Sequence, residues 1–209
     1  MAVVTNMSKT IAILVHGYNV SDPGETVGKL RPYFENENVL VEVFNYGYWP
    51  FTWQVRKRNP AEARYLAERC RYWKDKGYRV IVVGHSNGVA ITYLASKNYQ
   101  AKIDVCVGIN PALEVSLNPS PNAETVQIWH NKGDRPVKWA VLIRKVFKGV
   151  NARPWGAMGN IGYRGSDSNV VNFNAGEDFY QKADGHSDVF SKKKAPYFLQ
   201  LIAALAVNK

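Results

Sequence analysis

The chain has 209 residues, of which 46% are hydrophobic and 12% aromatic, so it can bury a sizeable core, which a disordered protein cannot. This length suits a single domain spanning residues 1–209. The formal net charge of +10 indicates either an ordinary basic surface or attraction to an anionic partner such as a phospholipid, an acidic glycan or a nucleic acid.

Short apolar runs alternate with helical patterns along the first half of the chain. A continuous apolar strand is expected over Thr10–Tyr18, followed by a weak helix over Gly24–Phe34 that Pro32 limits in length. A β-branched and aromatic strand is expected over Val39–Tyr48. A strong helix over Asn59–Gly77 has an asparagine as its N-cap, a proline in its first turn and a closing glycine.

The second half continues the alternation. The expected strands are Tyr78–Gly84, Lys102–Asn110, Glu124–Asp134 and Asn169–Gly176, and the expected helices are Ser86–Lys97, Val137–Gly149 and Ala195–Asn208. A glycine-rich loop is expected over Gly149–Ser168. This order predicts an α/β fold in which about six mostly parallel strands form one sheet with helices on both faces.

The segment "VIVVGHSNGVA" contains a glycine-x-serine-x-glycine motif, Gly84 to Gly88, between an expected strand and an expected helix. In this context the motif is a nucleophile elbow, a sharp turn that exposes Ser86 and needs small residues on both sides of it. The following helix adds N–H groups that favour developing negative charge. We therefore predict that Ser86 is a nucleophile.

A serine nucleophile needs a base, and the chain holds four histidines. His85 is adjacent to Ser86, and its side chain is expected to project away from the elbow. His16 and His130 lie near strand ends and are either structural or pocket-lining. His186 lies in the loop between the last strand and the last helix, from which it can reach Ser86, so we predict that it is the base; the alternative is an ordinary surface histidine.

The base needs a carboxylate to orient it. Asp134 lies after the apolar part of a strand, which ends near Trp129, and the order Ser86, Asp134, His186 is the nucleophile–acid–base order of this fold. The alternative is an aspartate that only caps a turn or a helix. Four other aspartates are weaker candidates because they lie beside the last strand or too close to the base, namely Asp167, Asp178, Asp184 and Asp188.

Two backbone N–H groups are also needed to bind the oxyanion that forms on the substrate carbonyl. One is predicted at Asn87, directly after the nucleophile, and the other at Tyr18, in the loop after the first strand. Gly17 lets that loop turn toward the site.

Together these segments resemble the α/β-hydrolases of the serine esterase and lipase kind. The resemblance rests on "LVHGYN", "VVGHSNGVA", "HNKGD" and "DGHSDVF", and it covers essentially the whole chain. It implies an ester or amide carbonyl as target, an acyl-enzyme intermediate and no cofactor. The chain has little room for extra N-terminal strands and no large cap insertion, so it is most similar to the compact members of this family, whose site is relatively open.

Two segments are expected to form the substrate pocket, Asn45–Trp53 and Ala152–Gly165. Their aromatic residues form either an acyl pocket or a membrane-facing rim, or they cover the core of a domain without a cap. The glycines of the second segment favour a small mobile lid. The predicted substrate-binding residues are His16, Gly17, Tyr48, Trp49 and Trp155.

The resulting hypothesis is a serine hydrolase that cleaves a small-molecule or lipid ester. The same residues would also serve a thioesterase, an amidase or an acyltransferase. A catalytically inactive hydrolase fold that binds an anionic partner is the alternative from another class. Oligomeric state and biological role do not follow from the sequence.

The remaining features name no further partner. The densest basic runs, Val55–Asn59 and Ser191–Lys194, lack the residues of a nucleic-acid module, so we expect no specific nucleic-acid partner. Cys70 and Cys106 fit small buried hydrophobic positions, and no metal-ligand spacing occurs, so we expect no disulfide and no metal. The apolar run Ile11–Val15 is too short for a signal peptide or a membrane span, which predicts a cytoplasmic protein.

Overall fold

The computed structural model describes residues 9–18, 20, 23–48, 51–136 and 155–208. Its strands form a six-stranded sheet in the order β2-β1-β3-β4-β5-β6, and every neighbouring pair is parallel. The strands are β1 (Thr10–Val15), β2 (Leu40–Phe44), β3 (Arg79–His85), β4 (Val105–Ile109), β5 (Thr125–His130) and β6 (Val170–Asn174). The α/β class and the six-stranded parallel sheet predicted from the sequence are confirmed.

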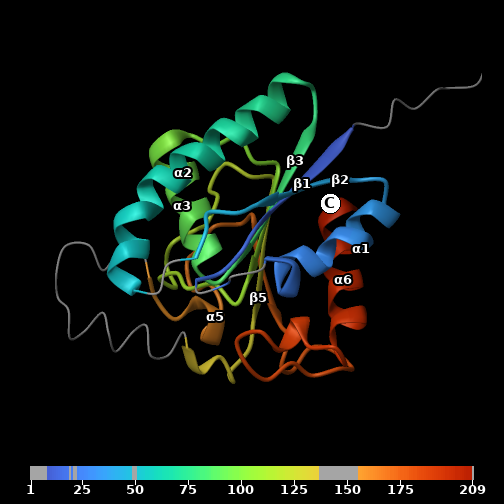
Figure 1. Cartoon of the computed structure of the whole chain (residues 1–209). Coiled ribbons are helices and arrows are strands. Elements are labelled where there is room, and N and C mark those ends of the chain that lie inside the picture. The colour runs from blue at the N-terminus through green and yellow to red at the C-terminus, as the bar shows by residue number, and fades with distance from the viewer. Residues whose placement is uncertain (1–8, 19, 21–22, 49–50, 137–154, 209) are drawn as a thin grey trace, which may run out of the picture.

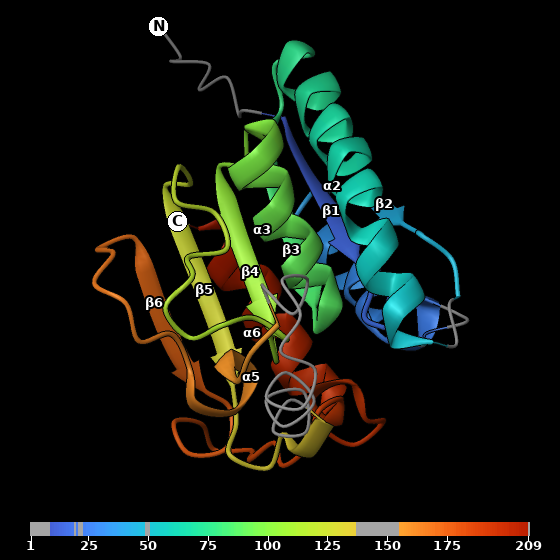
Figure 2. The same ribbon diagram turned by 90° about the vertical axis from the view of Figure 1, so that its left-hand side faces the viewer.

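Helices cover both faces of this sheet, as predicted (Figure 1). The longer helices are α2 (Thr52–Asp75) and α3 (Asn87–Tyr99) on one face and α6 (Ala195–Val207) on the other, where it lies beside the short α1 (Arg31–Asn36). Figure 2 shows α2 and α3 side by side across the sheet. Shorter elements are α5 (Met158–Ile161) and the 3-10 turns η1 (Pro23–Glu25), η2 (Val27–Leu30) and η4 (Asp188–Phe190).

The core consists of two apolar layers, one on each face of the sheet. In β1, Ile11 and Ile13 belong to the layer beneath α2 and α3, whereas Ala12 and Leu14 belong to the layer beneath α1 and α6. Both sets are buried. Residues 11–15 of this central strand are therefore all apolar, because helices cover both faces of the strand.

Helix α2 begins earlier than the sequence predicts. It starts at Thr52 and passes through Pro60, so Asn59 is an interior residue and not the N-cap. The Asn59 side chain is buried and donates a hydrogen bond to the side-chain oxygen of Asn87. The early start also buries Val55 against Ala90 of α3. This packing outweighs the disfavoured interior proline.

The other differences lie at the ends of elements. The helix expected over Gly24–Phe34 is replaced by two 3-10 turns and α1, and Pro32 lies in the first turn of that helix, where it needs no N–H partner. The second strand ends at Phe44, and the fifth ends at His130, leaving residues 131–134 as a turn. The predicted helix Val137–Gly149 lies outside the described residues.

The described part of the chain contains no helix that is both long and apolar enough to cross a membrane. Within the same residues, no group of three or more histidine, cysteine, aspartate or glutamate side chains is arranged to hold a metal ion. Cys70 and Cys106 are buried and unpaired, as the sequence predicts.

Because α2 packs on the sheet, shortening a buried side chain on its inner face should lower the stability of the protein considerably. Leu66 is fully buried there, so Leu66→Ala should lower the free energy of unfolding by about 2–5 kcal/mol. Urea denaturation measures this change. Arg64→Ala, two residues away on the exposed face of the same helix, should change it by less than about 0.5 kcal/mol. Equal effects of the two substitutions would contradict this packing.

Candidate active site

Ser86 lies at the turn between β3 and α3 and has the backbone conformation of a sharp corner. Its φ of 52° and ψ of −116° are unusual for a residue other than glycine. The residues two positions before and after Ser86 must be glycines, because a side chain at either position would clash with the backbone. A Cβ on Gly88 would lie 2.3 Å from the carbonyl oxygen of Val15, and one on Gly84 would lie 2.9 Å from the backbone nitrogen of Val89. The motif therefore forms the turn that its sequence predicts.

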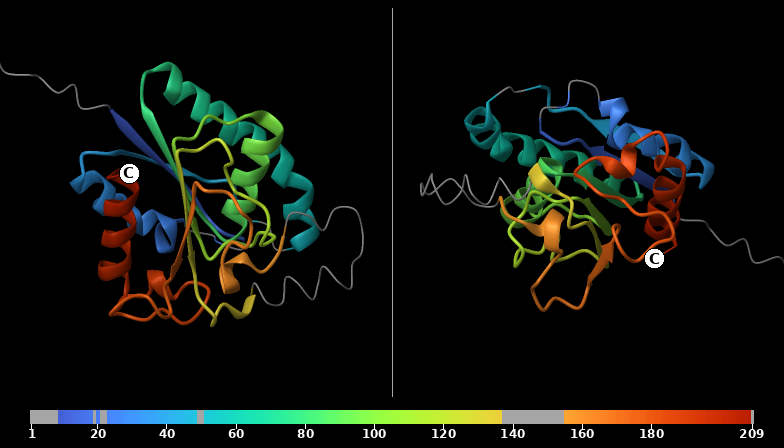
Figure 3. Two further views of the ribbon diagram at one scale, coloured as in Figure 1. Left: turned by 180° about the vertical axis from the view of Figure 1, so that it is seen from behind. Right: turned by 90° about the horizontal axis from the view of Figure 1, so that it is seen from below.

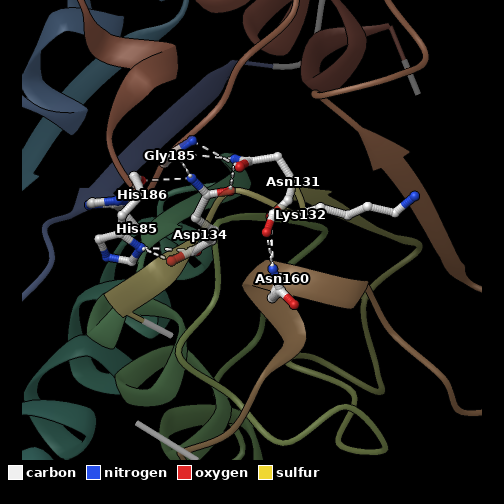
Figure 4. Close-up of polar contacts among 8 residues, drawn as sticks. His85, Asn131, Lys132, Asp134, Asn160, Gly185 and His186 are labelled. Atoms are coloured by element: carbon white, nitrogen blue, oxygen red, sulfur yellow. Dashed lines mark hydrogen bonds and ion pairs between the residues drawn. The ribbon is translucent and has the colours of Figure 1, made fainter. Parts of the chain in front are cut away.

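The structure brings His186 and Asp134 together from separate loops. His186 Nδ1 lies 2.9 Å from Oδ1 and 3.0 Å from Oδ2 of Asp134 (Figure 4). Asp134 is fully buried, whereas the His186 side chain is 19% exposed. With Nδ1–H donated to the carboxylate, Nε2 of a neutral His186 has a free lone pair that can accept a proton. This is the arrangement of a base held by an orienting acid.

The weaker aspartate candidates make other contacts. Asp167 accepts a hydrogen bond from the Tyr163 hydroxyl, and Asp178 accepts one from the backbone N–H of Asn174. Asp188 accepts a hydrogen bond from the backbone N–H of Asp184, within the loop that carries His186. The carboxylate of Asp134 is thus the one that the structure places against His186.

The ring of His85 lies against the His186 loop. Its Nε2 donates to the carbonyl oxygen of His186 at 3.1 Å, and the two rings have centroids 4.8 Å apart. The expectation for this side chain located it away from the elbow and did not anticipate this contact. Because His85 and Ser86 are consecutive, this hydrogen bond holds the loop of His186 close to the turn that carries Ser86.

Asparagines that follow the next two strands hold the same loop. Asn110, directly after β4, donates its side-chain amide to the carbonyl oxygens of His186 at 2.6 Å and Gly185 at 3.2 Å. Asn131, directly after β5, pairs with the backbone of Gly185 (Figure 4). The view from below in Figure 3 shows this end of the sheet, where the turn after β5, helix α5 and the loop before η4 gather.

Helix α5 supports the turn that carries Asp134. Asn160 donates its side-chain amide to the carbonyl oxygen of Lys132 at 2.7 Å (Figure 4). A Cβ on Gly159 would lie 2.6 Å from Oδ2 of Asp134, so a glycine is needed for this close approach. The sequence predicts only a loop over these residues, whereas the structure shows a short helix that packs against Asp134.

The predicted oxyanion donors lie on the other side of Ser86. Asn87 is the first residue of α3, so its backbone N–H has no carbonyl partner within the helix. Tyr18 is half-buried and packs with Val55, Ala90 and Trp155. The two segments that carry the predicted donors thus meet beside the N-terminus of α3.

The side chain of Asn87 makes four hydrogen bonds. Its oxygen accepts from Asn59 Nδ2 and Trp155 Nε1, both at 2.9 Å, and its amide donates to the Tyr46 hydroxyl and to Asn59 Oδ1, both at 3.2 Å. These partners come from α2, the segment before α5 and the loop after β2. The side chain therefore joins three parts of the chain around the first turn of α3.

His16 is buried and holds the loop after β1. Its Nδ1 donates to the carbonyl oxygen of Gly17 at 2.8 Å, and its Nε2 accepts from the backbone N–H of Tyr46 at 3.2 Å. The two rings stack with centroids 4.0 Å apart. Burial lowers the pKa of His16, which fits this neutral tautomer. Both ring nitrogens are occupied, so the prediction of a direct substrate contact by His16 is not supported by its position.

The other predicted substrate-binding residues have different surroundings. Gly17 lies against Ser86, since a Cβ on Gly17 would be 3.2 Å from the Cβ of Ser86. Trp155 is buried in the Asn87 cluster, and Tyr48 is 50% exposed. Trp49 lies outside the described residues.

Sequence analysis missed four polar residues around the site, namely Tyr46, Asn59, Asn110 and Asn131. In the sequence, Tyr46 is one of several aromatic residues in a single segment, and Asn59 has the pattern of a helix cap. Asn110 and Asn131 directly follow the observed strands β4 and β5 and lie at the carboxyl ends of the strands expected from the sequence. That position, at the ligand-binding edge of a parallel sheet, is the signal that could have found them.

Solved structures with the same fold are similar to this chain. A Xanthomonas campestris protein of the α/β superfamily of hydrolases has 16% identity and a TM-score of 0.52, with 94% of this chain and 99% of that one covered. Est1E from Butyrivibrio proteoclasticus, with ferulic acid bound, has 13% identity and a TM-score of 0.56 over 98% and 92% of the chains. The monoacylglycerol lipase of Paleococcus ferrophilus has 14% identity and a TM-score of 0.54 over 96% of each.

No protein-family model and no curated protein matches the chain. The six-stranded parallel sheet and the structural similarities establish that the chain has the α/β-hydrolase fold.

The environment of His85 predicts a dependence of stability on pH. Burial, aided by neighbouring His186, lowers the pKa of His85 from 6.5 to about 3. The unfolded chain therefore binds a proton between these values that the folded chain excludes, so stability is lost as the pH falls from 6.5 toward 3. From pH 7 to pH 5, this one group should lower the free energy of unfolding by up to about 2 kcal/mol.

Urea denaturation of the wild type and of His85→Gln at pH 7 and pH 5 measures this effect. Glutamine does not titrate and retains a donor for the carbonyl oxygen of His186, so the variant should lose less stability on acidification. All other titratable groups are present in both proteins, so the difference between the two losses isolates the contribution of His85. An identical loss in both proteins would show that His85 does not contribute.

Proposed function

We propose that the protein is a serine hydrolase that cleaves carboxylic esters through an acyl-enzyme intermediate. The observation that carries the proposal is the 2.9 Å contact between His186 and buried Asp134, at the same sheet edge as the elbow of Ser86. His85 supports the proximity of nucleophile and base, because it adjoins Ser86 and bonds to the backbone of His186.

In the proposed reaction, the Ser86 hydroxyl attacks the ester carbonyl while His186 Nε2 takes its proton. His186 then gives this proton to the departing alkoxide, which leaves as an alcohol. Water, deprotonated by His186, attacks the acyl-enzyme and releases the acid together with the Ser86 hydroxyl. Asp134 holds the His186 ring in the tautomer that this sequence needs and stabilises its positive form.

The backbone N–H groups of Asn87 and Tyr18 are the proposed donors to the oxyanion. The position of Asn87 at the start of α3 supports the first assignment, since helix dipole and N–H group act together there. His16 and Gly17 support the second indirectly, because the ring of His16 holds the Gly17 carbonyl group and thereby the loop before Tyr18.

The apolar cluster beside Asn87 is the proposed wall of the acyl pocket. Trp155, Tyr18 and Val55 form it, and the indole N–H of Trp155 is occupied by Asn87. Exposed Tyr48 is the proposed outer rim. Similarity to the monoacylglycerol lipase favours an ester over other carbonyl compounds.

Ser86→Ala should abolish covalent labelling by a fluorophosphonate and lower kcat for a p-nitrophenyl ester by at least about a thousandfold. The nucleophile is lost, whereas the fold is retained. Ser120→Ala, which changes another buried serine that bonds to Ser96, is the matched control and should label like the wild type. A wild type that neither labels nor hydrolyses esters would refute the proposed activity and favour a binding protein.

Asp134→Asn should lower kcat by about three to four orders of magnitude while KM changes little, because an amide no longer fixes the tautomer of His186. Steady-state kinetics with the same ester measure this loss. Asp104→Asn is the control, since Asp104 bonds to Lys74 and to the N–H of Val80 away from the site. Activity of Asp134→Asn within tenfold of wild type would assign the acid elsewhere.

A further inference from the structure

We propose that Asn131 is a positioning residue that fixes the catalytic base relative to its acid. This proposal rests on the proposed function of Ser86, His186 and Asp134. Asn131 is fully buried and follows β5, three residues before Asp134. From the sequence alone, Asn131 is only one residue of the expected strand Glu124–Asp134, and that position does not explain the contacts that its side chain makes.

The Asn131 side chain pairs with both backbone groups of Gly185, the residue before the base. The N–H of Gly185 donates to Oδ1 at 3.0 Å, and Nδ2 donates to the Gly185 carbonyl oxygen at 3.1 Å. Because an N–H group can only donate, these contacts define which end of the amide faces which group. The two hydrogen bonds hold the backbone of Gly185 in the way that a neighbouring β-strand would, by pairing with both its N–H and its carbonyl group.

The backbone of Asn131 is bonded to the acid side of the site. Its carbonyl oxygen accepts from the N–H of Asp134 at 3.2 Å, and its own N–H donates to Gly159 of α5 at 3.0 Å. Asn131 thus bonds through its main chain to the turn that carries Asp134 and through its side chain to the loop that carries His186 (Figure 4). The 2.9 Å contact between His186 and Asp134 spans the two segments that Asn131 joins.

Asn110 completes the arrangement. Its side-chain oxygen accepts from Asn131 Nδ2 at 3.2 Å, and its amide donates to the carbonyl oxygen of His186. Gly185 itself has a φ of 132°, a conformation that L-residues rarely adopt. A loop in this conformation needs external partners to keep one geometry, and the two asparagines supply them.

The residue type at position 131 follows from these partners. Alanine would leave the N–H and carbonyl groups of Gly185 without their buried partners. Aspartate would keep an acceptor for the N–H but would place an oxygen against the Gly185 carbonyl and Asn110 Oδ1. Only an amide of this length both donates and accepts here.

Steady-state kinetics of Asn131→Ala test the proposal. Since the base would be displaced from its productive position, kcat should fall about tenfold to a hundredfold, whereas KM should change less than about threefold. Asn118→Ala is the matched control, because Asn118 is a buried asparagine that bonds to Asn169 and Ser120 away from the site. It should lower the melting temperature and leave kcat within about twofold of wild type.

The same substitution in a His186→Ala background separates a positioning role from a structural one. If Asn131 acts through the base, the losses should not add, and the double variant should be as slow as His186→Ala alone. Additive losses, or an unchanged kcat in folded Asn131→Ala, would overturn the proposal. Should Asn131→Ala yield no folded protein, Asn131→Asp is compared with Asn118→Asp by the same criteria.

Failure of the proposed function has a different outcome. It would appear as a wild type without fluorophosphonate labelling or ester hydrolysis, whereas failure of the positioning role would appear only in the variants of an active wild type.

Discussion

The strained backbone of Ser86 is the constraint on which the rest of the site depends. A non-glycine residue in such a conformation costs on the order of 1–3 kcal/mol, so its surroundings must hold it. Its N–H donates to the carbonyl oxygen of Ile109, and its carbonyl oxygen accepts from the N–H groups of Val89 and Ala112. These bonds tie the turn to β4 and to the segment after it, which places Ser86 above the carboxyl ends of the strands.

The turn also decides how α3 crosses the sheet. Because Gly88 has no side chain, the helix can approach the carbonyl oxygen of Val15 at the end of β1. The loop that begins at His16 therefore passes directly beside the first turn of the helix. The close contact between Gly88 of α3 and Val15 of β1 therefore places the turn at Ser86 beside the loop that contains the predicted oxyanion donor Tyr18.

Much of this arrangement could be predicted from the sequence because the signals are local. Strands β1, β3 and β4 contain continuous apolar runs. Ser86 follows β3, Asp134 follows β5, and His186 lies in the loop after β6. Parallel strands bring their carboxyl ends to one edge of the sheet, so residues far apart in the sequence meet there. Asp134 and His186 were paired by this reasoning, and the structure places them 2.9 Å apart.

What the sequence did not predict depends on contacts between distant segments. Asn59 before Pro60 has the local pattern of a helix start. In the structure the helix already begins at Thr52, because Val55 packs against α3 and the Asn59 side chain bonds to Asn87. An asparagine after a strand, such as Asn131, has the local pattern of an ordinary turn. Its partners become visible only when the loop around Gly185 is positioned in space.

The choice of amides around the site has a physical reason. Two buried groups of asparagines flank Ser86, one centred on Asn87 and the other on Asn131. A neutral amide both donates and accepts, so it can hold backbone groups in a dry environment without the desolvation penalty of a charge. It also does not titrate, so the geometry that it holds does not change with pH.

The buried carboxylate of Asp134 contrasts with the neutral amide of Asn131 in the same turn. His16 and His85 support this contrast, since burial lowers the pKa of both and keeps them uncharged at neutral pH. A positive charge that forms on His186 would therefore interact with Asp134 without competition from these two histidines. Neutral amides thus hold the loop that carries His186, and the buried carboxylate of Asp134 lies against the ring of that histidine.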